Sequence, residues 1–288
     1  MQKRPEIFNI SDNVDFVFIK DDRFKTVKMS IYMFMPLDKS TASANAILPH
    51  ILVRSCEKFP DFSKLNEQLE NLYGAMIDSD VEKIGESQAL SISATFLDDR
   101  YSLDNQRISE QVTKLLCEML FHPKLINKKF CSDDINQEKR QLFEAIDAEY
   151  NDKKIYAKQQ CIRAMCANEA FGVHPLGEKE QIQNLTAEDI TAAWQNVLRH
   201  AYVKIIMIGN IDPTLAINTF KKAFASVERE QKNIKTKFIT EATGNIQRVT
   251  DTDKLNQSKL VLGLRAGMKN ADDNLPSIRI MTALLGGT

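Results

Sequence analysis

The chain has 288 residues, of which 43% are hydrophobic and 27% charged, a composition typical of a folded protein with one large domain or two smaller ones. Its 38 basic and 39 acidic side chains nearly cancel, so charge gives no reason to expect nucleic acid or an anionic membrane as a partner. No apolar run approaches the ~20 residues of a membrane span, and the N-terminus lacks a signal-peptide apolar core. We therefore expect no membrane span and a cytoplasmic location.

Cysteine usage agrees with that expectation. The chain has five cysteines, an odd number, and no export signal, so we expect reduced thiols. No Cys-x-x-Cys occurs, and Cys161 and Cys166 have no nearby histidine. We interpret these two as helix packing residues rather than metal ligands.

The first elements are predicted to be strands, followed by a helix. β-Branched and aromatic runs at residues 13–22 and 26–36 predict a hairpin whose second strand is largely buried. An alanine-rich helix begins near Thr41 and includes His50. Pro49 lies inside this run and would kink the helix, unless the helix proper begins near the proline.

A second helix and a second strand pair follow. Ser63 is the predicted N-cap of a helix that Gly74 ends. Residues 75–82 and 87–96 then predict two strands that turn around Gly85.

The remainder is mostly helical, with one more buried strand. Thr186, with Asp189 three residues later, predicts a near capping box. The predicted elements are helices over residues 104–121, 132–149, 153–167, 187–199 and 215–225, and a strand over 202–209. This order predicts an α+β fold, a mixed, mostly antiparallel sheet with helices over one face. A polar stretch at 228–250 resembles a linker, after which residues 258–264 predict a strand and 275–285 a helix.

Several segments carry a family resemblance through their order. Residues 171–227 contain Phe-Gly-x-His-Pro-Leu-Gly, then Ile-Gln-Asn-Leu-Thr-Ala-Glu-Asp-Ile, then a strand ending in Ile-Gly-Asn-Ile-Asp. A helix containing Glu-Lys-Arg-Gln-Leu-Phe-Glu-Ala-Ile from Glu138, and Leu-Leu-Gly-Gly from Leu284, add to them. Together they resemble the pitrilysin/insulinase-like family of zinc metallopeptidases, which includes the mitochondrial processing peptidase subunits. The resemblance spans nearly the whole chain.

The resemblance implies a metallopeptidase-like α/β roll followed by the start of a second related domain. Residues 1–230 would be the N-terminal peptidase-like domain with a degenerate zinc motif, 231–250 the linker, and 251–288 the beginning of the second homologous domain. Because family members contain two related halves, we expect that the end at Thr288 reflects a truncated chain or an interrupted reading frame.

The family's His-x-x-Glu-His motif falls on residues 50–54 and is largely lost. His50 matches the first zinc ligand, but Val53 stands at the general base and Arg54 at the second ligand. Valine cannot accept a proton from water. An arginine there would repel a dication by several kcal/mol at ~4 Å and an effective dielectric of ~20.

The third ligand is also missing from the best match. In the family, two glutamates seven residues apart lie on a later helix, and the second binds zinc. Glu138 matches the first, so Ala145 takes the ligand position, although a shift of one residue would place Glu144 there. We predict an ion pair between Arg54 and Glu138 in place of the metal. In the simpler interpretations, His50 is a packed histidine, and Glu138 is a solvated glutamate on the helix surface.

These matches imply a non-catalytic subunit that forms a peptide-binding chamber with a related zinc-carrying subunit, as in bacterial pairs of one intact and one degenerate chain. A homodimer is the other expected assembly. We expect no cofactor and only a vestigial His50. An active zinc endopeptidase with an atypical site is the alternative, and it predicts stoichiometric zinc and activity that depends on His50. A structural assembly factor is a further alternative.

Overall fold

The computed structural model describes residues 4–103, 105–230, 246–253, 257–267 and 273–286. These residues contain a six-stranded sheet with the strand order β1-β2-β6-β3-β5-β4. The strands are β1 (Glu6–Ser11), β2 (Val14–Lys20), β3 (Thr26–Pro36), β4 (Met76–Ile84), β5 (Ser87–Leu97) and β6 (Tyr202–Gly209). The α-helices are α1 (Ala42–Leu52), α2 (Phe62–Asn71), α3 (Ile108–Phe121), α4 (Ser132–Asn151), α5 (Lys153–Met165), α6 (Lys179–Asn184), α7 (Ala187–His200), α8 (Thr214–Ala225) and α9 (Leu275–Leu284).

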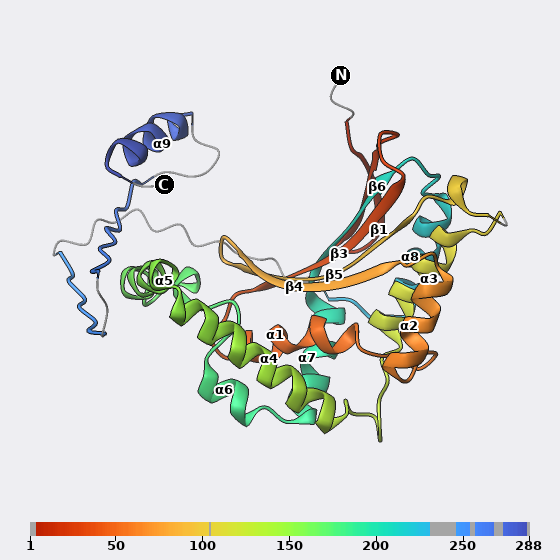
Figure 1. Cartoon of the computed structure of the whole chain (residues 1–288), viewed down its shortest axis with the longest axis horizontal. Coiled ribbons are helices and arrows are strands. Elements are labelled where there is room, and N and C mark those ends of the chain that lie inside the picture. Colours follow the sequence, from red (N-terminus) through yellow and green to blue (C-terminus); the bar gives the residue numbers. More distant parts are fainter. Residues whose placement is uncertain (1–3, 104, 231–245, 254–256, 268–272, 287–288) are drawn as a thin grey trace.

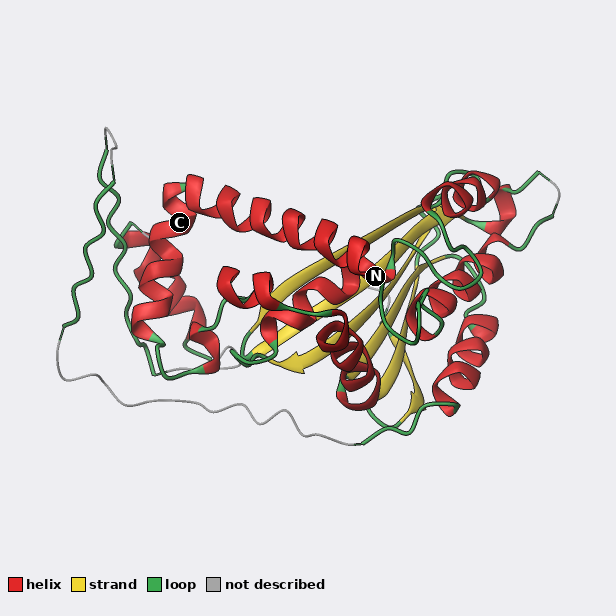
Figure 2. Ribbon diagram, turned by 90° about the horizontal axis from the view of Figure 1, so that it is seen from below, coloured by secondary structure: helices red, strands yellow, loops and turns green. Residues whose placement is uncertain are grey.

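Helices cover one face of the sheet. Figure 1 shows α1 to α4 and α6 to α8 gathered below the strands, and the view from below places them in front of the sheet (Figure 2). The core lies between these layers, where inward-facing side chains of β3, β5 and β6 meet α1, α3 and α7. Among the strand pairs of the described sheet, only β2–β6 is parallel. The predicted α+β fold with a mixed, mostly antiparallel sheet is therefore confirmed.

The predicted pairing of the first two strands is wrong. β2 and β3 are not neighbours, because β6 lies between them and pairs with both. The antiparallel partner of β2 is β1, a strand that the sequence analysis missed, and Asn13 makes the turn between them with φ of 57°. Every second residue of β6 is buried, because one face of this central strand packs into the core under the helices.

The start of α1 agrees with the prediction of a helix from near Thr41, and the start of α2 differs from the prediction. α1 begins at Ala42 and continues through Pro49, so the helix does not start near the proline. Ten of its eleven residues are buried, and this packing outweighs the roughly 3 kcal/mol that an interior proline costs. For α2 the N-cap is Asp61 rather than Ser63, since the Asp61 side chain accepts a hydrogen bond from the backbone of Lys64.

The later part of the chain follows the prediction as far as α8, except for the short helix α6, which the sequence analysis missed. The capping box of Thr186 and Asp189 is present at the start of α7. Residues 258–264, by contrast, form no strand, since no strand among the described residues pairs with them. Residues 231–245 of the predicted linker lie outside the described residues.

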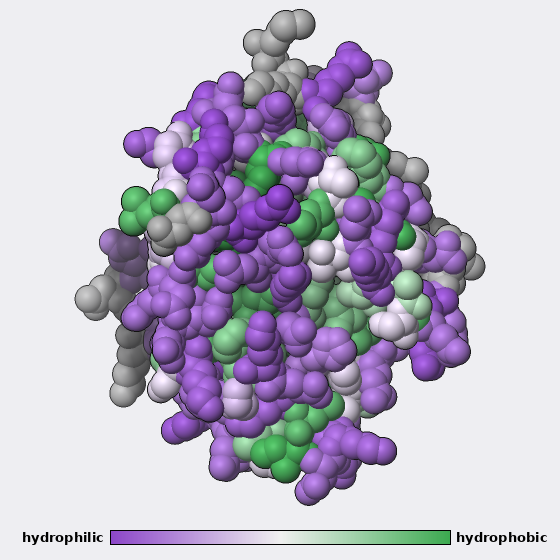
Figure 3. Space-filling model, turned by 90° about the vertical axis from the view of Figure 1, so that its right-hand side faces the viewer, coloured by the Kyte–Doolittle hydropathy of each residue, from purple (hydrophilic) through white to green (hydrophobic). Residues whose placement is uncertain are grey.

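Two surface properties complete the fold. No described helix is both long and apolar enough to cross a membrane. On the face that carries α2, α3 and α8, hydrophobic side chains lie in separate patches between hydrophilic ones (Figure 3).

Candidate functional site

The end of α1 brings the degenerate motif between the edge strand β4 and the long helix α4 (Figure 1). His50 lies in the last turn of α1, Val53 is the C-cap, and Arg54 follows the end of the helix. Val53 packs against the hydrophobic core and does not line the cavity beside His50. The three motif positions therefore have three different surroundings.

His50 is held against β4 and faces a small cavity. Its Nδ1 lies 2.8 Å from the hydroxyl of Ser79. The cavity, of about 340 Å³, lies between α1, β4, α4 and the loop that contains Pro175, and its lining includes Gln141 and Glu149. Burial lowers the pKa of His50, and the nearby negative charges of Glu138 and Asp80 oppose that shift. The neutral imidazole is thus favoured.

Arg54 is tied to the first half of α4. Its Nη1 donates to Glu138 Oε1 at 2.7 Å, and its Nη2 donates to Gln137 Oε1 at 2.8 Å. A second ion pair joins Nε to Asp134 Oδ1 at 3.3 Å. Residues 134, 137 and 138 face Arg54 together because positions three and four apart share one side of a helix. The Glu138 side chain is only 4% exposed and that of Arg54 26%. The predicted ion pair is confirmed.

The third ligand position faces the same cavity as His50. Ala145 lines it, whereas Glu144, one residue earlier, is exposed and does not. The structure therefore favours the match that places Ala145, rather than Glu144, opposite His50. On the predicted match, the methyl group of Ala145 takes the position of the third ligand.

These donors do not fit a catalytic zinc ion, which takes three protein ligands and a water molecule. His50 can supply a single ring nitrogen because Ser79 holds its Nδ1, Ala145 has no donor atom, and the guanidinium of Arg54 is a cation, so fewer than three ligands are present. Within the described part of the chain, no group of three or more His, Cys, Asp or Glu side chains could hold a metal ion. The five cysteines are free thiols.

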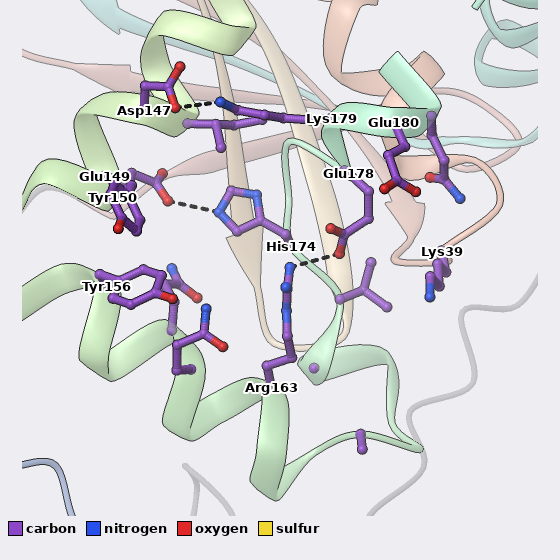
Figure 4. A pocket seen from close by; sticks show the side chains of 18 of the residues that line it. Lys39, Asp147, Glu149, Tyr150, Tyr156, Arg163, His174, Glu178, Lys179 and Glu180 are labelled. Carbon is purple, nitrogen blue, oxygen red and sulfur yellow. Dashed lines mark hydrogen bonds and ion pairs between the residues drawn. The ribbon is translucent and has the colours of Figure 1, made fainter. Parts of the chain in front are cut away.

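A second and larger cavity, of about 770 Å³, adjoins the first, and Glu149 lines both. Figure 4 shows that ion pairs bridge it from several elements. His174 Nε2 lies 2.8 Å from Glu149 Oε2, Arg163 donates to Glu178 at 2.7 Å, and Lys179 pairs with Asp147. The sequence analysis gave His174 no role, because its partner lies 25 residues away on α4.

The loop with the Phe-Gly-x-His-Pro-Leu-Gly motif is packed tightly beside these cavities. Gly177 has φ of +78°, and an added Cβ would lie 2.0 Å from Ser43 Oγ on α1. Lys83, near the end of β4, donates to the backbone oxygens of Phe171 at 2.9 Å and Val173 at 3.3 Å. Burial lowers the pKa of Lys83. The motif thus fixes the loop to α1 and β4.

The edge strand β4 completes the site. It pairs with β5 and with no other described strand, so its second edge leaves backbone donors and acceptors unpaired within the described sheet. Ser79, which holds His50, belongs to this strand. The degenerate motif is therefore adjacent to a strand that can accept another strand.

Comparisons with known proteins agree with this geometry. A family described as "Peptidase M16 inactive domain" matches residues 184–288. The "Probable inactive metalloprotease YmfF" of Bacillus subtilis (strain 168) is 29% identical over 269 residues, which cover 93% of this chain and 63% of that protein.

Solved structures show the same fold. A conserved protein from Enterococcus faecalis V583 superposes with a TM-score of 0.76 at 21% identity, over 84% of this chain and 56% of that one. A peptidase M16 inactive domain from Pseudomonas fluorescens gives 0.62 at 13% identity, over 81% and 53%. The chain thus spans a little under two thirds of the first relative and about half of these structures. The match of residues 184–288, the relative named as inactive and the shared fold together support the resemblance to a degenerate pitrilysin/insulinase-like (M16) metallopeptidase.

Proposed function

We propose that this chain is a non-catalytic subunit of an M16-type peptidase, which binds peptide and encloses it together with a related zinc-carrying subunit. The observation that carries the proposal is the pair of Arg54 and Glu138 beside Val53. A cation occupies the ligand position, and the general-base position has no proton acceptor. Hydrolysis would therefore come from the partner subunit.

Peptide binding is supported by the free edge of β4. An extended peptide can add to an exposed sheet edge, where main-chain hydrogen bonds supply affinity and side-chain pockets supply specificity. The cavity with His50 lies directly beside this edge. A peptide on β4 would pass the former catalytic position without being cut.

The face of the sheet opposite the helices supports the chamber. Tyr32 and Phe34 of β3 stack at a centroid distance of 6.2 Å, and Phe34 contacts Tyr202 of β6 at 6.1 Å. Ile31 and Met33, which alternate with these residues, are buried in the core, so the rings lie on the opposite face of the sheet. The labelled helices leave that face uncovered (Figure 1). Aromatic side chains of this kind provide contact area for a partially extended peptide.

The test is to purify the chain with its associated proteins from its native cell. Zinc content and peptide cleavage are then measured for the complex, for the chain alone and for a His50→Ala variant. We expect cleavage and zinc only when the partner is present, and no effect of His50→Ala on either.

Two results would contradict the proposal. Stoichiometric zinc in the isolated chain, with cleavage that His50→Ala abolishes, would identify an active peptidase with an atypical site. A complex that binds no peptide would instead indicate a structural assembly role.

A further inference from the structure

The outer side of β4 carries three acidic side chains in alternating positions, Asp78, Asp80 and Glu82, which we call the acidic row. All three are exposed. Since successive side chains of a strand point to opposite faces, the three share one face, and Ser79 and Val81 lie on the other. Ser79 contacts His50 on the helix-covered face, so strand alternation directs the acidic row to the opposite face. The Asp80 carboxylate also accepts a hydrogen bond from the backbone N–H of Val81 at 2.8 Å, and Asp80 lines the cavity beside His50.

No positive charge on the sheet neutralises the acidic row. Its register partners on β5 are Ser93, Ser91 and Ala89, all uncharged. The next strand, β3, places Ser30, Tyr32 and Phe34 in the same positions. Directly across from the acidic row, the first cation is Lys204 on β6, three strand spacings or about 14 Å from β4. Lys28 on β3 shares this face two strand spacings from β4, but it lies opposite Met76 rather than an acidic residue. No ion pair to the acidic row forms among the described residues.

The ends of the same side of β4 are apolar. Met76 is 59% exposed and Ile84 is 49% exposed. A strand added to the free edge would place its side chains directly opposite these five, with Cβ atoms about 5 Å apart. Opposite charges attract at that distance, and apolar side chains gain by contact with the flanking Met76 and Ile84.

We propose that β4 selects extended peptides that carry lysine or arginine at alternating positions, so that three basic side chains lie opposite Asp78, Asp80 and Glu82. This inference rests on the proposed function, because it specifies the peptide class that the edge strand accepts. Charge complementarity decides the choice of occupant, and the alternation follows from strand geometry. Exposed charges on an edge strand also discourage edge-to-edge aggregation, and that simpler role is an outcome of the test.

The test measures peptide affinity by fluorescence anisotropy with the full chain, alone and in complex with its partner. Three labelled peptides of the same length as β4 are compared. One has lysines at three alternating positions, the second has the same composition with the three lysines adjacent, and the third has threonine in place of lysine. The first two have equal charge, so only the alternating arrangement distinguishes them.

We expect the alternating peptide to bind about tenfold more tightly than the threonine peptide and clearly more tightly than the adjacent-lysine peptide. The triple variant Asp78→Asn, Asp80→Asn, Glu82→Gln should remove this preference and leave the affinity for the threonine peptide unchanged. The matched control neutralises three exposed carboxylates on and before α2, with Glu57→Gln, Glu67→Gln and Glu70→Gln, and should retain the preference.

Equal affinity for the two lysine peptides, or an unchanged preference in the triple variant, would overturn the inference. If all three peptides then bind alike, the proposed peptide-binding function stands and the acidic row serves only to protect the edge. Failure of every peptide to bind, with or without the partner, would overturn the inference and the proposed function together.

Discussion

The ion pair between Arg54 and Glu138 offers the sharpest test of the degenerate site. Arg54→Leu would leave the Glu138 carboxylate, whose side chain is 4% exposed, without its cation. At a charge separation of about 4 Å and an effective dielectric of about 20, the lost attraction is about 4 kcal/mol. Removal of one member of a buried pair costs about 3–5 kcal/mol, and the partial exposure of Arg54 favours the lower end. We expect the free energy of unfolding to fall by about 3 kcal/mol.

The measurement is urea denaturation monitored by circular dichroism. The slope of the unfolding free energy against urea concentration should be the same in the variant and the unmodified chain. The double variant Arg54→Leu, Glu138→Leu should recover most of the loss, because it leaves no buried charge unpaired. Lys114→Leu is the matched control, since Lys114 and Glu110 form an ion pair at the same 2.7 Å but on the surface. It should cause no measurable change. A loss in Arg54→Leu no larger than in this control would refute the reasoning.

Three further predictions concern other parts of the chain. Burial lowers the pKa of His50 in the folded protein, so below about pH 6.5 the unfolded chain binds the proton more readily and the free energy of unfolding decreases as the pH is lowered. Urea titrations of His50→Gln at several pH values should show a shallower decrease than the unmodified chain, and parallel curves for the two proteins would argue against this prediction. Gly177→Ala should lower the melting temperature more than Gly85→Ala, because both glycines have positive φ but only Gly177 has a neighbour, Ser43, in the way of a Cβ; equal shifts would exclude the steric contact. Burial raises the pKa of Cys117 to about 12, so mass spectrometry after iodoacetamide treatment at pH 8 should find this thiol unmodified in the folded protein and modified in urea.

Local patterns in the sequence predicted much of the fold. The alternation around Gly85 predicted β4 and β5, and the capping box at Thr186 predicted the start of α7. These features depend on neighbours along the chain, so short-range rules describe them. The pairing of β2 with β6 depends on residues nearly 190 positions apart, and no local pattern shows it.

The candidate site divides in the same way. The family resemblance, together with the opposite charges, predicted that Arg54 contacts Glu138, and the structure confirms it. The contact between His174 and Glu149 was not predicted, because it requires α4 and the loop after α5 to be placed side by side. The motif Phe-Gly-x-His-Pro-Leu-Gly was the available signal, but it marks the loop rather than its partner.

The sequence by itself determined which chemical groups are present at the motif: a valine cannot act as a base, an arginine cannot bind zinc, and an alanine has no donor atom. Those statements hold for any placement of Val53, Arg54 and Ala145, because they follow from the side chains alone. Only the tertiary structure decided that β4 lies at a free edge and that Glu138 is buried against Arg54. Edge position and burial are relations between distant segments, and they exist only when the whole sheet and its helices have assembled.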